Sequence, residues 1–271
     1  MKIINLIVSL IFIILFVMMV VPIQIISNLF NLRLKYIMPE KFFQLINNLI
    51  GIKVEVDEAS FKYLNEQNNI GKLLVSNHVS WIDILAIGSL FKGRFIAKKE
   101  VEAMGLFGFL ANINNTFFID NTKVSRSLDY TKIIRNELLK GHNLILFPEG
   151  TTSDGSSIHK FKSSFFESAN TTYICSKLNL EKYISVQPIT LIYLKKNGLP
   201  MGAITRREIA WIGDIPILEL MLNFLMSGTV TVSVKVDKAV TIKEFENRKL
   251  MRDYCEDTIR KNITDRIHYY I

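Results

Sequence analysis

A histidine and an aspartate follow an apolar segment at a spacing that suits acid–base chemistry. His78 comes just after residues 73–76, and Asp83 lies about one turn further on if a helix begins near Ser80. A carboxylate on one nitrogen of an imidazole fixes the tautomer and leaves the other nitrogen free to take a proton. The chain has no G-x-S-x-G motif that would supply a nucleophile. We therefore expect His78 to act on a substrate hydroxyl; a locally bonded, non-catalytic histidine is the alternative.

A second polar segment follows another apolar run. Residues 147–155 read FPEGTTSDG. Proline and glycine favour turns, while serine and threonine donate hydrogen bonds, so such a segment can present donors to an anion or a polar head group. We expect Glu149 either to accept a hydrogen bond from a substrate hydroxyl or to hold a neighbouring loop. An ordinary turn between a strand and a helix is the alternative.

The third feature is Pro188, which interrupts the β-prone segment 185–193. Proline cannot donate a backbone hydrogen bond, so it is awkward in a central strand. The sequence therefore predicts a bulge or the start of a strand at this position.

The elements that must position these residues alternate along the chain beyond residue 51. The β-prone segments are 52–56, 73–76, 95–97, 116–119, 144–147, 185–193 and 229–236. Helices are expected at 122–140, 163–178 and 243–270, the last opened by a capping box of Thr241 and Glu244. This alternation predicts an α/β domain with a mostly parallel sheet flanked by helices.

The N-terminal segment predicts a membrane anchor. Residues 3–32 carry no charged side chain, and about 20 apolar residues in a helix cross a bilayer core. Only Lys2 precedes the run and no cleavage site follows it, which favours an uncleaved anchor over a signal peptide. Arg33, Lys35 and Lys41 follow the run. By the positive-inside rule, we expect the domain on the cytoplasmic face of the inner membrane.

Two details of this segment leave alternatives open. Pro22 and the polar residues that follow it are also compatible with insertion into a single leaflet. A second helix, expected at 39–50, has a broad apolar face that suits either the membrane or the core. We predict a membrane-anchoring helix pair at 1–50 and an α/β domain at 51–271.

Composition limits the classes of function. The chain has 271 residues, 49% of them hydrophobic, which excludes a disordered protein. A formal net charge of +8 suits an anionic partner. The positive charge is dispersed and no nucleic-acid motif is present, so we expect no nucleic-acid partner. Cys175 and Cys255 can form neither a disulfide framework nor a cysteine-rich zinc site, and we expect no metal.

Taken in order, four motifs resemble those of the glycerolipid acyltransferases, most closely the bacterial lysophosphatidate type. They are N-H-x-x-W-x-D, F-x-I-D, F-P-E-G-T and V-Q-P-I, and the resemblance covers roughly residues 50–240. It implies that His78 is the catalytic base and Asp83 its orienting carboxylate. It also implies a set of substrate-binding residues: Lys99, Asn121, Glu149, Gly150, Thr151, Thr152 and Pro188.

The resemblance implies transfer of a fatty acyl group from acyl-carrier protein or acyl-CoA to the hydroxyl of a lysolipid. The first expectation is 1-acyl-sn-glycerol-3-phosphate as acceptor, giving phosphatidic acid for phospholipid biosynthesis. However, Asn121 and Thr152 stand where the family commonly has arginine, which binds phosphate bidentately. The segment 211–214 also resembles a bacterial subgroup with members that acylate lyso-ornithine lipid, which is the alternative acceptor. No cofactor is expected beyond the acyl donor, and a membrane-anchored thioesterase is the rival activity.

Overall fold

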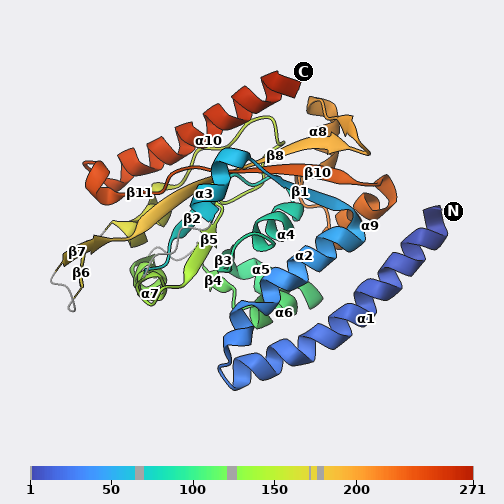
Figure 1. Cartoon of the computed structure of the whole chain (residues 1–271), viewed down its shortest axis with the longest axis horizontal. Coiled ribbons are helices and arrows are strands. Elements are labelled where there is room, and N and C mark those ends of the chain that lie inside the picture. The colour runs from blue at the N-terminus through green and yellow to red at the C-terminus, as the bar shows by residue number, and fades with distance from the viewer. Residues whose placement is uncertain (1, 65–69, 121–126, 171, 176–179, 271) are drawn as a thin grey trace.

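The computed structural model describes residues 2–64, 70–120, 127–170, 172–175 and 180–270. Its centre is a nine-stranded sheet in which seven strands follow the order β1-β10-β8-β2-β5-β3-β4, while β9 and β11 pair with β8 (Figure 1). The strands are β1 (Ile52–Val56), β2 (Leu73–Ser76), β3 (Gly93–Lys98), β4 (Phe117–Ile119), β5 (Asn143–Leu146), β8 (Ser185–Lys196), β9 (Leu199–Pro200), β10 (Val230–Val236) and β11 (Val240–Thr241).

Most of this sheet is parallel, which confirms the predicted fold class. The pairs β2–β5, β2–β8, β3–β5, β3–β4 and β1–β10 are parallel, while β8 pairs antiparallel with β9, β10 and β11. The strands β8, β2, β5, β3 and β4 therefore point the same way, and their carboxyl ends meet along one edge of the sheet.

Helices cover both faces of the sheet. They are α1 (Lys2–Leu29), α2 (Met38–Ile50), α3 (Phe61–Leu64), α4 (Ile82–Gly88), α5 (Lys99–Glu102), α6 (Leu106–Ile113), α7 (Ser127–Leu139), α8 (Ala203–Ile209), α9 (Ile217–Ser227) and α10 (Arg248–Tyr270). Short 3-10 turns are η1 (Arg33–Tyr36), η2 (Glu58–Ser60), η4 (Ser163–Ala169) and η5 (Ile242–Glu244).

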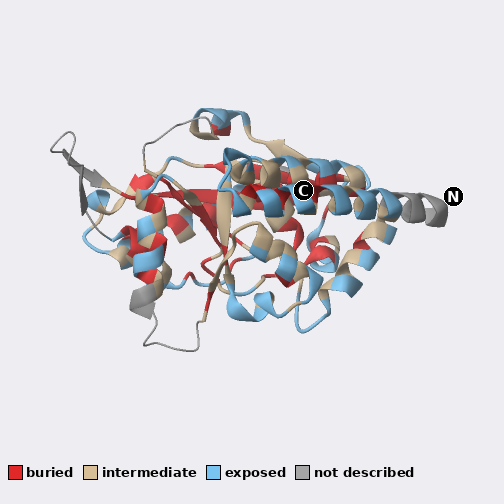
Figure 2. Ribbon diagram, turned by 90° about the horizontal axis from the view of Figure 1, so that it is seen from below, coloured by how far each residue is buried: buried red, intermediate tan, exposed pale blue. Residues whose placement is uncertain are grey.

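Two cores follow from the alternation of side chains along the strands. Leu74 faces a core with α2, α4 and α9, whereas Leu73 and Val75 face a core with α7 and α10. Accordingly α10 lies on one side of the sheet and α2 and α4 lie on the other (Figure 1). Figure 2 shows the buried residues concentrated in the sheet between these layers.

The N-terminal helix α1 packs alongside α2, where Phe16 stacks on Phe42 with ring centroids 5.7 Å apart. Residues 10–29 are long and apolar enough to cross a membrane, with a mean hydropathy of 2.8, and only 17% of them are buried. The polar end of α1 docks on the domain, because Gln24 Nε2 and Asn28 Nδ2 donate to the carbonyl of Ile113 at 3.2 and 2.6 Å. Whether α1 spans the bilayer or enters one leaflet stays open.

The second predicted anchor helix belongs to the packing of the domain. Its residues Phe43, Ile46, Asn47 and Ile50 are buried, and Asn47 Nδ2 donates to the carbonyl of Leu85 in α4 at 3.1 Å. The helix α2 therefore forms part of the core of the α/β domain. The division of the chain at residue 50 stays a prediction.

One predicted helix is wrong. A helix was expected at 163–178, but 163–169 form η4 and 172–175 form the strand β6 (Thr172–Cys175), which pairs antiparallel with β7 (Leu180–Tyr183). Residues 171 and 176–178 lie outside the described part of the chain. Thr172, Tyr173 and Ile174 are β-branched or aromatic residues that favour a strand. The local strand preference therefore outweighed the helical pattern.

Two other predicted helices differ at their beginnings. The capping box of Thr241 and Glu244 is present, but it caps the single turn η5, and α10 begins only at Arg248. The helix expected from residue 122 is described from Ser127, and residues 122–126 lie outside the described part of the chain.

Candidate active site

The structure brings His78 and Asp83 together as a hydrogen-bonded pair at the carboxyl end of β2. The strand ends at Ser76, and α4 begins at Ile82 and carries Asp83 in its first turn. His78 Nδ1 and Asp83 Oδ2 are 2.8 Å apart. Asp83 is fully buried, and the side chain of His78 is 17% exposed. The imidazole therefore stays accessible while the carboxylate that orients it is shielded from water.

Backbone groups hold the carboxylate of Asp83 in place. Its Oδ2 atom accepts hydrogen bonds from the N–H groups of Val79 and Ser80 at 2.6 and 2.8 Å. These donors lie just before the first turn of α4, where charge on a carboxylate is favoured. The local turn thus fixes the carboxylate that bonds to His78.

Tyr193 is a member of the site that the sequence reasoning missed. Its hydroxyl donates to Asp83 Oδ1 at 2.6 Å, and the side chain is buried in β8. Burial and the charge of Asp83 raise the pKa of Tyr193, so the hydroxyl stays a donor. The sequence feature that could have identified Tyr193 is a tyrosine in a long apolar strand, because a buried phenol needs a hydrogen-bond partner.

The ring of His78 is fixed from the side as well. It stacks on Phe147, with the ring centroids 4.0 Å apart and the planes 12° from parallel. Phe147 directly follows β5, the parallel neighbour of β2. The adjacent strand ends therefore supply the imidazole and the surface against which it lies.

Glu149 holds two backbone segments together. Its Oε1 accepts from the N–H of His78 at 2.7 Å, and its Oε2 accepts from the N–H of His159 at 2.6 Å. Only 2% of Glu149 is exposed, and burial raises its pKa to about 7 against the lowering effect of those two N–H donors. Of the two expected roles, holding a neighbouring loop is the one that these contacts show.

Further hydrogen bonds close the loops around His78. The carbonyl of His78 accepts from Ser153 N at 2.7 Å and from Ser153 Oγ at 3.1 Å. Thr152 Oγ1 donates to the carbonyl of Trp211, and Trp211 N donates to the carbonyl of Val79 at 2.8 Å. The threonine that replaces the family's arginine is therefore tied to the Trp211 segment.

Gly150 and Thr151 lie in the same turn. Gly150 has a φ of 71°, and a Cβ atom there would lie 2.7 Å from Lys162 Nζ. Only glycine adopts this left-handed conformation without strain. Thr151 is exposed. The turn therefore brings a lysine close to the backbone of the F-P-E-G-T motif.

Pro188 lies inside the continuous strand β8, so it does not mark a strand start. The pairing is irregular opposite it, because four residue steps from Val236 to Val240 face three from Ile189 to Val186, so the expectation of a bulge is met on the partner side. It is buried and pairs with Val75 of β2. Its carbonyl accepts from Asp237 N at 3.1 Å. On that side β10 ends at Val236 and β11 begins at Val240. The N–H and C=O of a strand residue point the same way. The N–H that Pro188 lacks would therefore point to the segment where the partner of β8 changes from β10 to β11.

The two remaining predicted site residues, Lys99 and Asn121, make none of the contacts described above. Lys99 is exposed at the first position of α5, just after β3. Asn121 lies outside the described residues. Within the residues that the structure describes, no group of three or more His, Cys, Asp and Glu side chains is placed to hold a metal ion.

Comparisons with known proteins show the family of this chain. Residues 58–192 match the family model "Acyltransferase". A lyso-ornithine lipid O-acyltransferase from Rhizobium meliloti is 31% identical over 92% of this chain and 82% of its own. A 1-acyl-sn-glycerol-3-phosphate acyltransferase from Neisseria gonorrhoeae is 25% identical over 72% of this chain and 70% of its own.

The fold has a solved counterpart. The 1-acyl-sn-glycerophosphate (LPA) acyltransferase PlsC from Thermotoga maritima superposes with a TM-score of 0.64 at 20% sequence identity. The match covers 98% of this chain and 97% of that chain. This likeness shows the fold. The family model and the Rhizobium relative lead to one conclusion: the chain is an O-acyltransferase and belongs to the acyltransferase family.

Proposed function

We propose that this enzyme transfers a fatty acyl group from a thioester donor, acyl-carrier protein or acyl-CoA, to the free hydroxyl of a lysolipid. The observation that carries the proposal is the exposed imidazole of His78 held on a buried Asp83. The relatives named as lysolipid O-acyltransferases give the class of acceptor. The serine that contacts His78, Ser153, donates to the backbone carbonyl and not to the imidazole, so direct transfer fits better than a covalent intermediate.

In this scheme His78 takes the proton of the acceptor hydroxyl through Nε2, while Asp83 stabilises the imidazolium that forms. The hydroxyl oxygen bonds to the thioester carbonyl carbon. The C–S bond then breaks, and His78 returns the proton to the leaving thiol. The products are an ester and a free thiol, so the atoms balance without a metal or a redox cofactor.

We propose lyso-ornithine lipid as the acceptor. Two relatives with that name, from Rhizobium meliloti and Brucella abortus, match at higher identity and over more of the chain than the Neisseria relatives named 1-acyl-sn-glycerol-3-phosphate acyltransferase. Thr152 also fits this choice, since its hydroxyl is tied to Trp211 where the family commonly offers a phosphate-binding guanidinium. Lyso-ornithine lipid carries a carboxylate and an ammonium group and no phosphate.

Lysophosphatidate is the second candidate acceptor. It is favoured by Lys162, whose ammonium group lies beside the backbone of Gly150 in the turn after β5. A lysine beside a glycine turn can bind phosphate as a point charge. Transfer to this acceptor would give phosphatidic acid and place the enzyme in phospholipid biosynthesis.

The proposed site of action is the cytoplasmic face of the inner membrane. α1 offers an apolar surface to lipid, and Arg33, Lys35 and Lys41 follow it on the domain side. Both proposed acyl donors are water-soluble, whereas a lysolipid lies in the bilayer. An anchored domain would meet both at the interface.

The test is acyl transfer by the membrane-bound full chain with labelled acyl donor. Lyso-ornithine lipid and lysophosphatidate are offered separately, with acyl-carrier protein and CoA as alternative donors. We expect labelled ornithine lipid, and a loss of at least about a hundredfold in rate for His78→Ala because the base is removed.

The controls separate the alternatives. Labelled phosphatidate without labelled ornithine lipid would make lysophosphatidate the acceptor in place of lyso-ornithine lipid. Free fatty acid released without either acceptor would favour a thioesterase and contradict the proposal. Full transfer by His78→Ala would contradict the mechanism, and His159→Ala serves as the matched control because only its backbone N–H contacts the site.

A further inference from the structure

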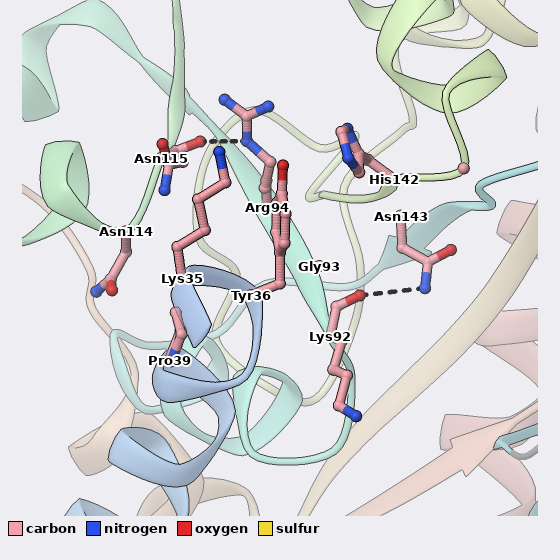
Figure 3. A pocket seen from close by; sticks show the side chains of 11 residues that line it. Lys35, Tyr36, Pro39, Lys92, Gly93, Arg94, Asn114, Asn115, His142 and Asn143 are labelled. Atoms are coloured by element: carbon pink, nitrogen blue, oxygen red, sulfur yellow. Dashed lines mark hydrogen bonds between the residues drawn. The ribbon is translucent and has the colours of Figure 1, made fainter. Parts of the chain in front are cut away.

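A cavity of about 240 Å³ lies away from the catalytic pair (Figure 3). Its wall includes Gly93, the first residue of β3, and Asn143, the first residue of β5. His78 follows the opposite, carboxyl end of β2, which runs parallel to β5. The cavity is therefore at the amino edge of the sheet, and the acyl-transfer scheme gives it no part.

The lining of this cavity is basic. Lys35 from η1, Lys92 before β3 and Arg94 within β3 line it, and no carboxylate is among its lining residues. Glu137 lies behind this wall, where its carboxylate is already shared by Arg94 and His142, each at 2.8 Å. Such a surface attracts an anion.

The cationic wall is held in a fixed position. Arg94 Nε donates to the carbonyl of Asn115 at 2.8 Å, and its Nη1 donates to Glu137 at 2.8 Å. Across the cavity, Tyr36 stacks on His142 with ring centroids 5.0 Å apart. Figure 3 shows Lys35 and Tyr36 of η1 and Arg94 of β3 reaching toward the same region. A preformed set of donors loses little entropy when it binds a ligand.

Hydrogen bonds join this wall to the membrane helix. Asn28 in α1 accepts from Asn115 Nδ2 at 3.0 Å and donates to the carbonyl of Ile113 at 2.6 Å. Asn115 in turn accepts from Arg94. A continuous chain of contacts therefore runs from the end of α1 to the guanidinium in the cavity.

The mouth of the cavity lies where the chain leaves α1. Lys35 and Tyr36 belong to η1, which is bordered by the exposed apolar side chains Leu32, Leu34 and Ile37. Apolar side chains next to basic and aromatic ones are typical of the level of lipid head groups. This position favours a ligand that is itself part of the membrane.

We propose that this cavity is a second binding site, separate from the catalytic one, for the phosphate group of an anionic membrane glycerolipid. Lys35 and Arg94 would bind the phosphate oxygens, and the acyl chains would lie along the apolar side chains that flank η1. Lys92, whose ammonium group points away from them (Figure 3) and lies 3.9 Å from Glu40, would add positive charge nearby. The same donors could also bind a free phosphate ester. The test therefore distinguishes a lipid head group from a free ester. The proposal does not depend on the proposed acyl transfer.

The test measures thermal stabilisation of the full chain in a neutral detergent. The ligands are short-chain phosphatidylglycerol, short-chain phosphatidylcholine and glycerol 3-phosphate. We expect a saturable rise in Tm with phosphatidylglycerol that phosphatidylcholine does not match. Lys35→Gln/Lys92→Gln should weaken the apparent affinity by about tenfold, because a charged hydrogen-bond donor and a nearby positive charge are lost.

The matched control is Arg33→Gln/Lys41→Gln, which removes the same charge from neighbouring residues that do not line the cavity. It should keep the affinity within about twofold, since diffuse charge alone contributes little at ordinary salt. Equal losses in both variants would indicate diffuse attraction and overturn the proposal.

The other outcomes of the test also support or overturn the proposal. A shift with phosphatidylglycerol but not with glycerol 3-phosphate assigns the site to lipid, whereas a shift with both shows that the phosphate group is sufficient. No shift, or an equal shift with phosphatidylcholine, overturns the proposal. A shift that survives Lys35→Gln/Lys92→Gln would place the ligand elsewhere, including the catalytic site.

Discussion

At the scale of the residue, the site depends on the carboxylate of Asp83, which accepts hydrogen bonds from more groups than His78 alone. Asp83 accepts from His78, from two backbone N–H groups and from Tyr193. Each donor that stabilises the carboxylate also reduces the negative charge felt by the imidazole. Tyr193 therefore helps to position the carboxylate that holds His78.

Replacing Tyr193 tests this positioning role. Tyr193→Phe keeps the buried ring and removes the donor, so the imidazolium is held more tightly. We expect kcat to fall about threefold to tenfold with little change in KM, and the acidic limb of the pH–rate profile to move to higher pH. Thr190→Val is the control, because Thr190 is buried in the same strand but bonds to Asn262. If the acidic limb of the pH–rate profile does not move, Tyr193 has a structural role only.

Glu149 gives a pH dependence of stability. Burial raises its pKa from 4.5 in the unfolded chain to about 7 in the fold, so the folded state holds the proton more tightly. The free energy of unfolding should therefore fall as pH rises from about 4.5 to 7, by up to roughly 3 kcal/mol. Denaturation of detergent-solubilised protein across this range measures it. Glu149→Gln should lose this slope, and parallel curves for the two proteins would refute the assignment.

At the scale of the element, α2 is positioned by a close approach to α4. Asn47 bonds to the carbonyl of Leu85, and Gly88 lets the ring of Phe43 lie against the end of α4. A Cβ atom on Gly88 would lie 2.3 Å from a ring carbon of Phe43. Since α4 carries Asp83, the helix that looks like an anchor in the sequence supports the catalytic turn.

A substitution at Gly88 should disturb this support. Gly88→Ala forces Phe43 or the helix to move, at a cost of about 1–3 kcal/mol of stability. We expect a lower Tm and a reduced kcat. Gly202→Ala is the control, because a Cβ atom there meets nothing within 4 Å. Equal melting temperatures for both variants would show that the α2–α4 contact adapts without cost.

At the scale of the whole molecule, the apolar exposed surface is concentrated on α1. Phe12, Leu15 and Met18 are each more than half exposed, whereas the polar residues near its end dock on the domain. The helix α9 lies against α1 and adds exposed Leu218 and Met226. Exposed apolar surface of this extent is typical of a membrane-binding face.

Charges on that surface should release the protein from the membrane. Leu15→Arg/Met18→Arg removes no packing contact of a buried residue but places two charges where lipid is expected. We expect most of the protein in the supernatant after alkaline carbonate extraction. Leu199→Arg/Ile204→Arg alters equally exposed residues outside α1 and should stay in the pellet. Retention of both variants would contradict anchoring by α1.

Local patterns were sufficient where one segment contains all the interacting atoms. His78 and Asp83 are joined by a single turn, and the continuous apolar run at residues 73–75 supplies both buried faces of β2. The helix expected at 163–178 failed because local preferences there compete, and pairing with β7 favours the strand. Pro188 was placed at a strand boundary because the change of partner from β10 to β11 cannot be seen in the sequence of β8 alone.

The sequence by itself determined the α/β class, the long apolar helix and the order of the motifs, because each depends on spacing along one segment. Only the tertiary structure decided that Tyr193 reaches Asp83 across 110 residues and that Glu149 ties two loops together. It alone also collected Lys35, Lys92 and Arg94 around one cavity. These contacts depend on which strands lie side by side, and long-range packing fixes that order.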